Sequence, residues 1–265
     1  AIETARTQIG KLLGAKTTGL DADRLIFTSG VTESNTLALR GILGGGTTGE
    51  SKPSRLAISS IEHVNLTDTA KQLEKEGCQV DFLPVGSNGL VQLAGLEKLL
   101  EEPNPPQLVS VVAASNETGV VQPIAEIARM CRPKGVLVHT DAAQLVGKLP
   151  IDFATLGVDA LSLSGHKFHG PNGVGGLLLR HGVSLTPQMH GGHQQEGFRP
   201  GTESVAIAMG MAKALELFYS EAAERVMRLT TLRDHLEEEL GQIYPAIQII
   251  GANSPRLPQT SCVSL

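Results

Sequence analysis

The sequence has few aromatic residues, no tryptophan and few cysteines. Its 265 residues include 2 Tyr and 6 Phe, so aromatic side chains make up 3% of the chain. The cysteines are Cys78, Cys131 and Cys262, and no two of them form a C-x-x-C pair. An odd number of cysteines in a long chain predicts no disulfide framework and favours a reducing compartment.

Excess basic charge and long apolar runs are also missing. The 22 basic and 27 acidic side chains give a formal net charge of −5, whereas binding to nucleic acid or anionic lipid requires a basic patch. The apolar runs are far shorter than the roughly 20 residues that cross a bilayer, and the first residues lack a signal peptide's apolar core. We therefore expect a soluble cytoplasmic protein with no nucleic-acid or membrane partner; an organelle stays open, because a transit peptide would precede Ala1.

Short runs rich in Val, Ile and Leu alternate with helical patterns along most of the chain. The runs lie at 25–27, 56–58, 80–83, 108–113, 136–139, 160–163 and 176–179. The helical patterns lie at 32–43, 63–76, 92–102, 123–132 and 142–156. Apolar runs that do not alternate with polar residues are typical of strands buried on both faces. The pattern predicts an α/β fold with a mainly parallel central sheet and helices on both faces.

The pattern changes after Gly201. Residues 203–241 have helical periodicity with many Glu and Arg, and two short extended pieces follow near 246–250 and 259–265. We predict a large domain at 1–203, with connecting helices and the beginning of a small C-terminal α+β domain at 204–265. The chain starts inside an amphipathic pattern and stops inside an apolar run, so we expect a fragment that lacks both ends.

A lysine follows the apolar run at 160–163. Lys167 has hydrogen-bonding neighbours in Ser164 and His166, and the glycine-rich stretch 173–176 allows close backbone packing behind it. A surface lysine at the start of a loop is the common interpretation of such a position. The alternative is a lysine that bonds covalently to an aldehyde, which requires a fixed and partly desolvated amine.

An aspartate, Asp141, follows the apolar run at 136–139. Such a carboxylate often caps the next helix. In open α/β sheets, however, ligands bind at the carboxyl ends of the strands, and Asp141 and Lys167 follow consecutive predicted strands. Pyridoxal phosphate (PLP) requires these two groups, one to keep its ring nitrogen protonated and the other to hold its aldehyde.

Small hydroxyl residues and a glycine follow the first predicted strand. Ser29, Gly30 and Thr32 stand where a helix begins, and a helix N-terminus with free N–H groups and hydroxyl donors fits a phosphate. The signal is weak alone, because Ser and Thr are also ordinary caps. The sequence has neither the G-x-x-x-x-G-K-[ST] nor the G-x-G-x-x-G pattern of nucleotide loops.

Six motifs in order resemble one family. They are Thr28-Ser29-Gly30-Val31-Thr32-Glu33-Ser34-Asn35, Ser60-Ile61-Glu62-His63, Ser115-Asn116-Glu117-Thr118-Gly119, His139-Thr140-Asp141-Ala142-Ala143-Gln144, Ser164-Gly165-His166-Lys167-Phe168 and Phe198-Arg199-Pro200-Gly201-Thr202-Glu203. The sequence resembles class V aminotransferase-like PLP enzymes of fold type I, and within them cysteine desulfurases and selenocysteine lyases. The last motif and 256–260 are somewhat more similar to the selenocysteine lyases.

The resemblance implies a role for each matched residue, and it makes 1–203 the PLP-binding domain. The implied catalytic residues are Lys167, which bonds to the PLP aldehyde, Asp141, which pairs with the ring nitrogen, and His63, which stacks on the ring. The implied further cofactor contacts are Gln144 and Asn116 at the 3-oxygen, and Thr32, Ser164 and His166 at the phosphate. Thr202 would reach the phosphate of the neighbouring subunit in a homodimer. For Arg199, a structural salt bridge is the alternative to a role in the site.

The implied reaction removes sulfur or selenium from L-cysteine or L-selenocysteine and gives L-alanine. The freed Lys167 would remove the α-proton, and in desulfurases a separate cysteine thiolate attacks the substrate sulfur. None of the three cysteines lies in a loop that matches the family's catalytic one. We therefore expect that cysteine, and the arginine that binds the substrate carboxylate, to lie outside this chain; a sulfur- or selenium-acceptor protein is a possible partner.

Two alternatives stay open. The first alternative to a desulfurase or lyase is another class V enzyme, such as an aminotransferase or a kynureninase-like hydrolase. The second is an inactive PLP-fold fragment that serves as a partner protein. His190 and His193 do not predict a metal site, because the other ligands of a zinc site are missing around them. The residues do not distinguish cysteine from selenocysteine as the substrate.

Overall fold

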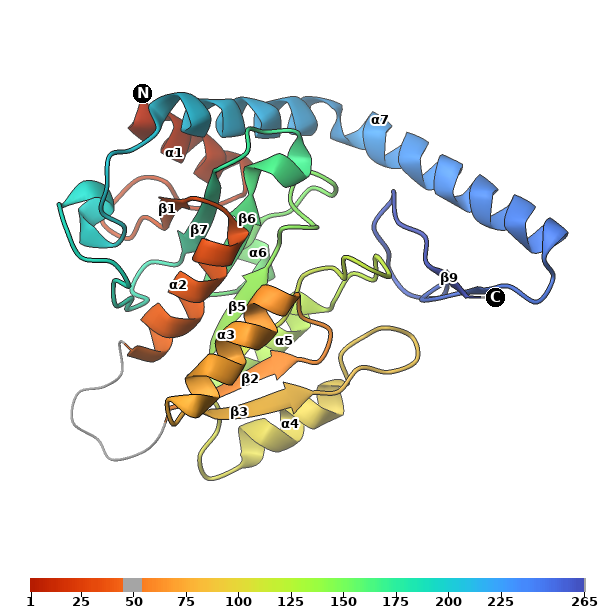
Figure 1. Cartoon of the computed structure of the whole chain (residues 1–265), viewed down its shortest axis with the longest axis horizontal. Helices are drawn as coiled ribbons and strands as arrows, with labels where there is room; N and C mark the ends of the chain where they lie inside the picture. The colour runs from red at the N-terminus through yellow and green to blue at the C-terminus, as the bar shows by residue number, and fades with distance from the viewer. Residues whose placement is uncertain (45–53, 265) are drawn as a thin grey trace.

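The computed structural model describes residues 1–44 and 54–264 and contains a seven-stranded sheet (Figure 1). Its strands are β1 (Arg24–Thr28), β2 (Arg55–Ser59), β3 (Gln79–Leu83), β4 (Leu108–Ser110), β5 (Leu137–Asp141), β6 (Ala160–Ser164) and β7 (Gly175–Leu179). They are arranged in the order β1-β7-β6-β5-β4-β2-β3. The strands from β6 to β3 are parallel, and β7 is antiparallel to both β6 and β1.

Helices cover both faces of the sheet, as predicted. They are α1 (Ile2–Leu12), α2 (Val31–Gly44), α3 (Val64–Lys75), α4 (Leu93–Glu101), α5 (Ile124–Cys131), α6 (Phe153–Leu156) and α7 (Val205–Ile243). Successive residues of a strand point to opposite faces, so neighbours in β1 belong to different cores. Ile26 lies in the core with Leu39 of α2 and Leu66 of α3, while Phe27 lies in the core with Ile9 of α1.

The seven predicted strands are confirmed, and one predicted helix is wrong. β4 ends at Ser110, three residues before its predicted end. In place of a helix over 142–156, the chain forms turns and then α6, which has 4 residues. Gly147 has a φ of 73°, and a Cβ there would lie 2.2 Å from Cβ of Phe168. A left-handed glycine in close contact with a neighbouring segment interrupts a helix.

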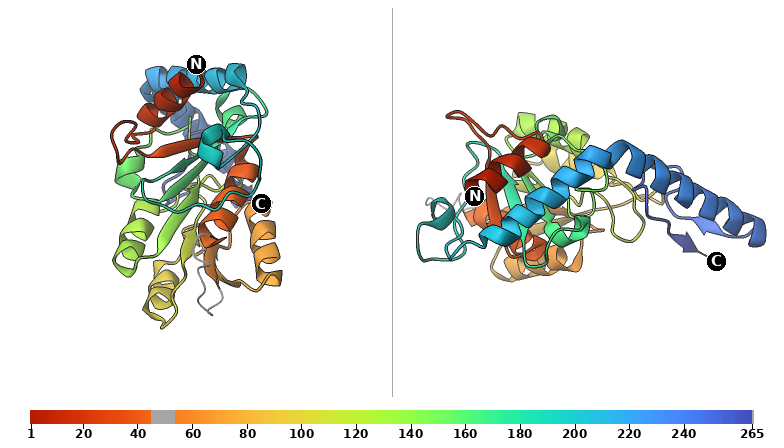
Figure 2. Two further views of the ribbon diagram at one scale, coloured as in Figure 1. Left: turned by 90° about the vertical axis from the view of Figure 1, so that its left-hand side faces the viewer. Right: turned by 90° about the horizontal axis from the view of Figure 1, so that it is seen from above.

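The helical periodicity over 203–241 is confirmed, and in place of several connecting helices the chain forms one helix, α7, whose two halves differ. The first half packs against α1 and buries Met211, Leu215 and Phe218. The second half extends past the sheet (Figure 2) and exposes Met227 and Leu232. After α7, the short strands β8 (Gln248–Ile249) and β9 (Val263–Ser264) pair in antiparallel fashion. Within the described residues, none of the helices combines the length and the apolar character needed to span a bilayer.

Candidate active site

The carboxyl ends of the parallel strands bring the predicted residues to one edge of the sheet. Asp141 ends β5 and Ser164 ends β6, while His63 follows β2 and Asn116 follows β4. The carboxyl ends of parallel strands lie at the same edge of a sheet. Segments that are far apart in the sequence therefore meet at this edge.

Asp141 is the most buried ionisable group at this edge, with 4% of its surface exposed. Its Oδ2 accepts a hydrogen bond from Nδ2 of Asn35 at 2.7 Å, and its Oδ1 accepts one from the backbone N–H of Ala143 at 2.9 Å. Burial raises the pKa of Asp141, while these two hydrogen bonds and the charges of His63 and Lys167 oppose the rise. Asn35 comes from α2 and was not among the predicted site residues.

Lys167 lies in the short 3₁₀ turn η2 (Gly165–Phe168), directly after β6. Its backbone carbonyl accepts a hydrogen bond from Nζ of Lys148 at 3.2 Å. The glycine-rich stretch packs closely, as predicted: a Cβ on Gly175 would lie 2.6 Å from the carbonyl carbon of Gly30. The side chain of Lys167 is exposed. The described residues therefore do not bury its amine, whereas the sequence predicts a partly desolvated one.

His63 is the N-cap of α3, and its Nδ1 accepts a hydrogen bond from the backbone N–H of Asn65 at 3.2 Å. His63 therefore has the ordinary role of a helix cap. His63 also lines a cavity of about 390 Å³ together with Asn116, and both side chains are exposed. One cavity thus contains two of the predicted residues.

Glu62 is a second carboxyl group at this edge. It lies in the Ser60-Ile61-Glu62-His63 motif, and the sequence does not predict it as a site residue. Its Oε1 accepts hydrogen bonds from Oγ of Ser59 at 2.6 Å and from the backbone N–H of Val112 at 2.7 Å. Its Oε2 is buried and has no hydrogen-bond partner among the described residues. Desolvation, with the nearby charge of Asp141, raises the pKa of Glu62 to about 8, so the group is mostly neutral at pH 7.

The residues predicted for the phosphate are spread over three segments. Ser164 is fully buried, and its Oγ lies 3.0 Å from Nδ1 of the exposed His166. Oγ1 of Thr32 accepts a hydrogen bond from Nδ2 of Asn65 at 3.4 Å. Thr202 is exposed and lines a separate cavity of about 180 Å³. Gln144, three residues after Asp141, is half-buried.

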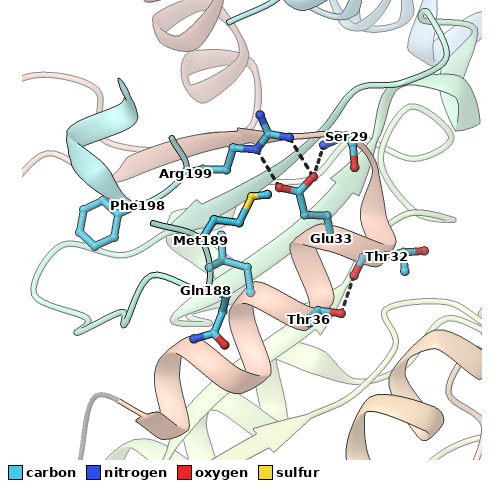
Figure 3. Close-up of a pocket in the computed structure, with 9 residues that line it drawn as sticks. Ser29, Thr32, Glu33, Thr36, Gln188, Met189, Phe198 and Arg199 are labelled. Atoms are coloured by element: carbon cyan, nitrogen blue, oxygen red, sulfur yellow. Dashed lines mark hydrogen bonds and ion pairs between the residues drawn. The ribbon is translucent and has the colours of Figure 1, made fainter. Parts of the chain in front are cut away.

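Arg199 forms the structural salt bridge considered for it. Its Nε donates to Oε1 of Glu33 at 2.8 Å, and its Nη2 donates to Oε2 at 3.3 Å (Figure 3). Oε2 of Glu33 also accepts from the backbone N–H of Ser29 at 2.7 Å. Burial works to raise the pKa of Glu33, but the hydrogen bonds from Arg199 and Ser29 outweigh it and lower the pKa. The pair fixes the loop after β1 beside a cavity of about 440 Å³.

Comparisons with known proteins place the chain in a family. The family model described as aminotransferase class-V matches residues 1–265. The chain belongs to this family. It is 40% identical over 258 residues to the cysteine desulfurase IscS of Dictyoglomus turgidum, covering 97% of this chain and 63% of that protein. It is 42% identical over 238 residues to the IscS of Serratia proteamaculans, covering 89% of this chain and 56% of that protein.

Solved structures also match this class V chain. A NifS-like protein superposes with a TM-score of 0.90 at 36% identity, over 100% of this chain and 70% of that one. The NifS-like protein from Rickettsia africae has a TM-score of 0.89 at 32% identity, over 99% and 69%. The predicted fold class is therefore confirmed, and membership of the family implies PLP as a cofactor. The chain spans less than two thirds of the length of these two curated relatives.

The residues that line the cavity with His63 and Asn116 include none of the three cysteines of the class V chain. Cys78 and Cys131 are buried and Cys262 is half-buried. Burial raises the pKa of Cys78 and, with the charge of Asp159, raises the pKa of Cys131 to about 12. A thiolate nucleophile is therefore disfavoured at both buried positions. In residues 1–44 and 54–264, no group of three or more His, Cys, Asp or Glu is placed to hold a metal ion.

Proposed function

We propose that this chain provides most of the PLP site of a cysteine desulfurase or selenocysteine lyase. The observation that carries the proposal is Asp141, a buried carboxylate held by two N–H donors at the same sheet edge as the exposed Lys167. Relatives at about 40% identity that are named cysteine desulfurase support L-cysteine as the substrate. Because the chain covers only part of those relatives, we assign the activity to a longer protein that contains it.

The donor set at the edge fits PLP. A buried carboxylate suits a protonated ring nitrogen, an exposed primary amine suits an aldehyde, and hydroxyl and imidazole donors suit a phosphate. Asp141 and Lys167 would make the first two contacts. His63 would stack on the ring, with Gln144 and Asn116 near its 3-oxygen. The phosphate ligands proposed are Thr32, Ser164 and His166.

In this proposal each chain residue has a defined task. PLP, when bound, supplies an electron sink for negative charge at the substrate's α-carbon. The amine of Lys167 accepts the α-proton as a general base. Asp141 holds the proton on the ring nitrogen, and Asn116 orients the substrate. The raised pKa of the buried thiols supports a catalytic cysteine elsewhere.

Further parts of the proposal concern assembly. We propose a homodimer in which Thr202 contacts the phosphate in the partner's site, because Thr202 is exposed and lies outside the cavity that contains His63. We also propose that 1–203 forms the PLP-binding domain and that 204–265 begins the small domain. A sulfur- or selenium-acceptor protein and a cytoplasmic location remain predictions.

Alanine release tests this function directly. L-cysteine and L-selenocysteine would be supplied with PLP to this chain and to a chain extended to the length of the relatives. We expect alanine from the extended chain, and none when Lys167 is replaced by Ala. No alanine from either substrate in a folded, PLP-loaded extended chain would contradict the proposal, and keto-acid formation instead would indicate an aminotransferase.

A further inference from the structure

Asn35 is a fully buried polar side chain in α2 to which the proposed mechanism gives no task. Its Nδ2 lies 2.7 Å from Oδ2 of Asp141 and 3.5 Å from Oδ1 of Asn65. Its own Oδ1 is buried and has no partner among the described residues. The hydrogen bonds of this side chain among the described residues therefore come from its N–H groups. Burying an unsatisfied amide oxygen is unfavourable.

Few groups stabilise the ionised form of Asp141. Within the described ranges, Asn35 provides the only side-chain hydrogen bond to Asp141, and the backbone N–H of Ala143 provides the other hydrogen bond. The ionisable groups that act on Asp141 from outside its strand are Glu62, His63 and Lys167. Burial favours the neutral acid, so the loss of one of two donors has a large effect.

The strand that carries Asp141 contains another ionisable side chain, which is uncharged. His139 is fully buried, and its two ring nitrogens lie 2.8 Å from Oγ of Ser110 and 2.9 Å from Oγ of Ser162. Desolvation lowers the pKa of His139 to about 3. His139 therefore gives Asp141 no compensating positive charge at neutral pH, which leaves the hydrogen bond from Asn35 as a main determinant of ionisation.

We propose that Asn35 is a positioning residue that keeps Asp141 ionised and orients its carboxylate. The consequence for the cofactor rests on the proposed function, since a protonated Asp141 could not hold a proton on the ring nitrogen of PLP. The contact between Asn35 and Asp141 itself does not depend on that function. Loss of the amide N–H therefore changes the titration of Asp141 even in protein without PLP.

The contacts extend from Asp141 to the exposed residues. Asn65, which accepts from Asn35, has its Oδ1 3.1 Å from Nδ1 of His63 and donates from Nδ2 to Oγ1 of Thr32 at 3.4 Å. A change at Asn65 breaks this outer part and leaves the contact between Asn35 and Asp141 in place. Leucine has a volume similar to that of asparagine and no side-chain N–H, so Asn35→Leu removes the donor. Asn65→Ala is the matched control.

The test is a pH titration of the Asp141 carboxyl carbon by NMR in ¹³C-aspartate-labelled protein without PLP, with the signal assigned from Asp141→Asn. We expect Asn35→Leu to move the titration midpoint up by about one pH unit or more, the effect of losing a hydrogen bond to a charged group. Asn65→Ala should move it much less. An unchanged midpoint in folded Asn35→Leu would overturn the proposal.

Two further measurements keep the proposal testable. If Asn35→Leu does not fold, the side-chain amide proton of Asn35 in the unchanged protein should titrate together with Asp141, and independence of the two signals would overturn the proposal. PLP binding followed by absorbance should weaken in Asn35→Leu relative to the unchanged protein. If the unchanged protein binds no PLP but the midpoint still shifts, the proposed function fails and the role of Asn35 stands.

Discussion

The inner and outer halves of the site are built differently. The inner half consists of Asn35, Glu62 and Asp141. Four hydrogen bonds of 2.6 to 2.9 Å hold its carboxyl groups, and a longer contact of 3.5 Å joins Asn35 to Asn65. The outer half, Thr32, His63, His166 and Lys167, is exposed, and the side chains of its first three members make contacts of 3.0 to 3.4 Å. Rigid surroundings preorganise charge, whereas accessible side chains remain available to a ligand. The fold of this chain thus sets the electrostatics of the inner half, and in the proposed function the outer residues contact the ligand.

The largest effect is expected at Lys167, in the outer half. Lys167→Ala should lower alanine formation by the extended chain about 10³-fold or more, because the proposed general base is lost. The free energy of unfolding should change by less than about 0.5 kcal/mol, because the side chain is exposed. Enzyme assays and urea denaturation check the two parts. Retained activity would show that the two halves were assigned wrongly.

Glu62→Gln tests the inner half through pH. The pKa of Glu62 is raised from 4.5 to about 8 in the folded protein. The folded state therefore binds the proton more tightly than the unfolded state, and this contribution to stability falls as pH rises from 4.5 to 8. The variant should lose several kcal/mol of that pH dependence, since each unit of the pKa change corresponds to about 1.4 kcal/mol, measured by urea denaturation. Glu224→Gln, at an exposed position of α7, is the control and should keep the slope.

Ser162→Ala tests the buried hydrogen bonds of His139, which lies two residues before Asp141 on β5. Its hydroxyl lies 2.9 Å from Nε2 of the buried His139, so the change leaves a ring nitrogen without a partner. We expect a loss of about 1–2 kcal/mol in the free energy of unfolding, against little change for the exposed Ser220→Ala on α7. Equal effects of the two changes would mean that the buried histidine does not depend on this contact.

The smallest effect is expected for His166→Ala in the outer half. If His166 binds the phosphate, the variant should bind PLP about 5- to 10-fold more weakly, the loss of one hydrogen bond. Binding of pyridoxal, which has no phosphate, should not change. Absorbance titrations with both compounds make the comparison, and an equal loss for both would place His166 elsewhere in the site.

The sequence predicted the strand ends better than the contacts between elements. Asp141 and Lys167 are predicted because each lies at or just after the end of a buried strand and carries a group that PLP requires. Glu62 lies three residues after β2, as Lys167 lies three residues after β6. Its burial, and that of Asn35, arises from contacts between elements: the packing of α2 on the sheet, and the hydrogen bonds of Glu62 to Ser59 at the end of β2 and to Val112 after β4. The helix over 142–156 failed for the same reason, because the turn at Gly147 packs against Phe168.

The most direct test of the account is to identify the residue that carries PLP. After incubation with PLP and reduction with borohydride, the visible absorption band should disappear, and peptide mapping should find the label on Lys167. Lys167→Ala should show neither the band nor the label, while Asn65→Ala should keep both. No band in the unchanged protein, or a label on Lys148 in place of Lys167, would contradict the account.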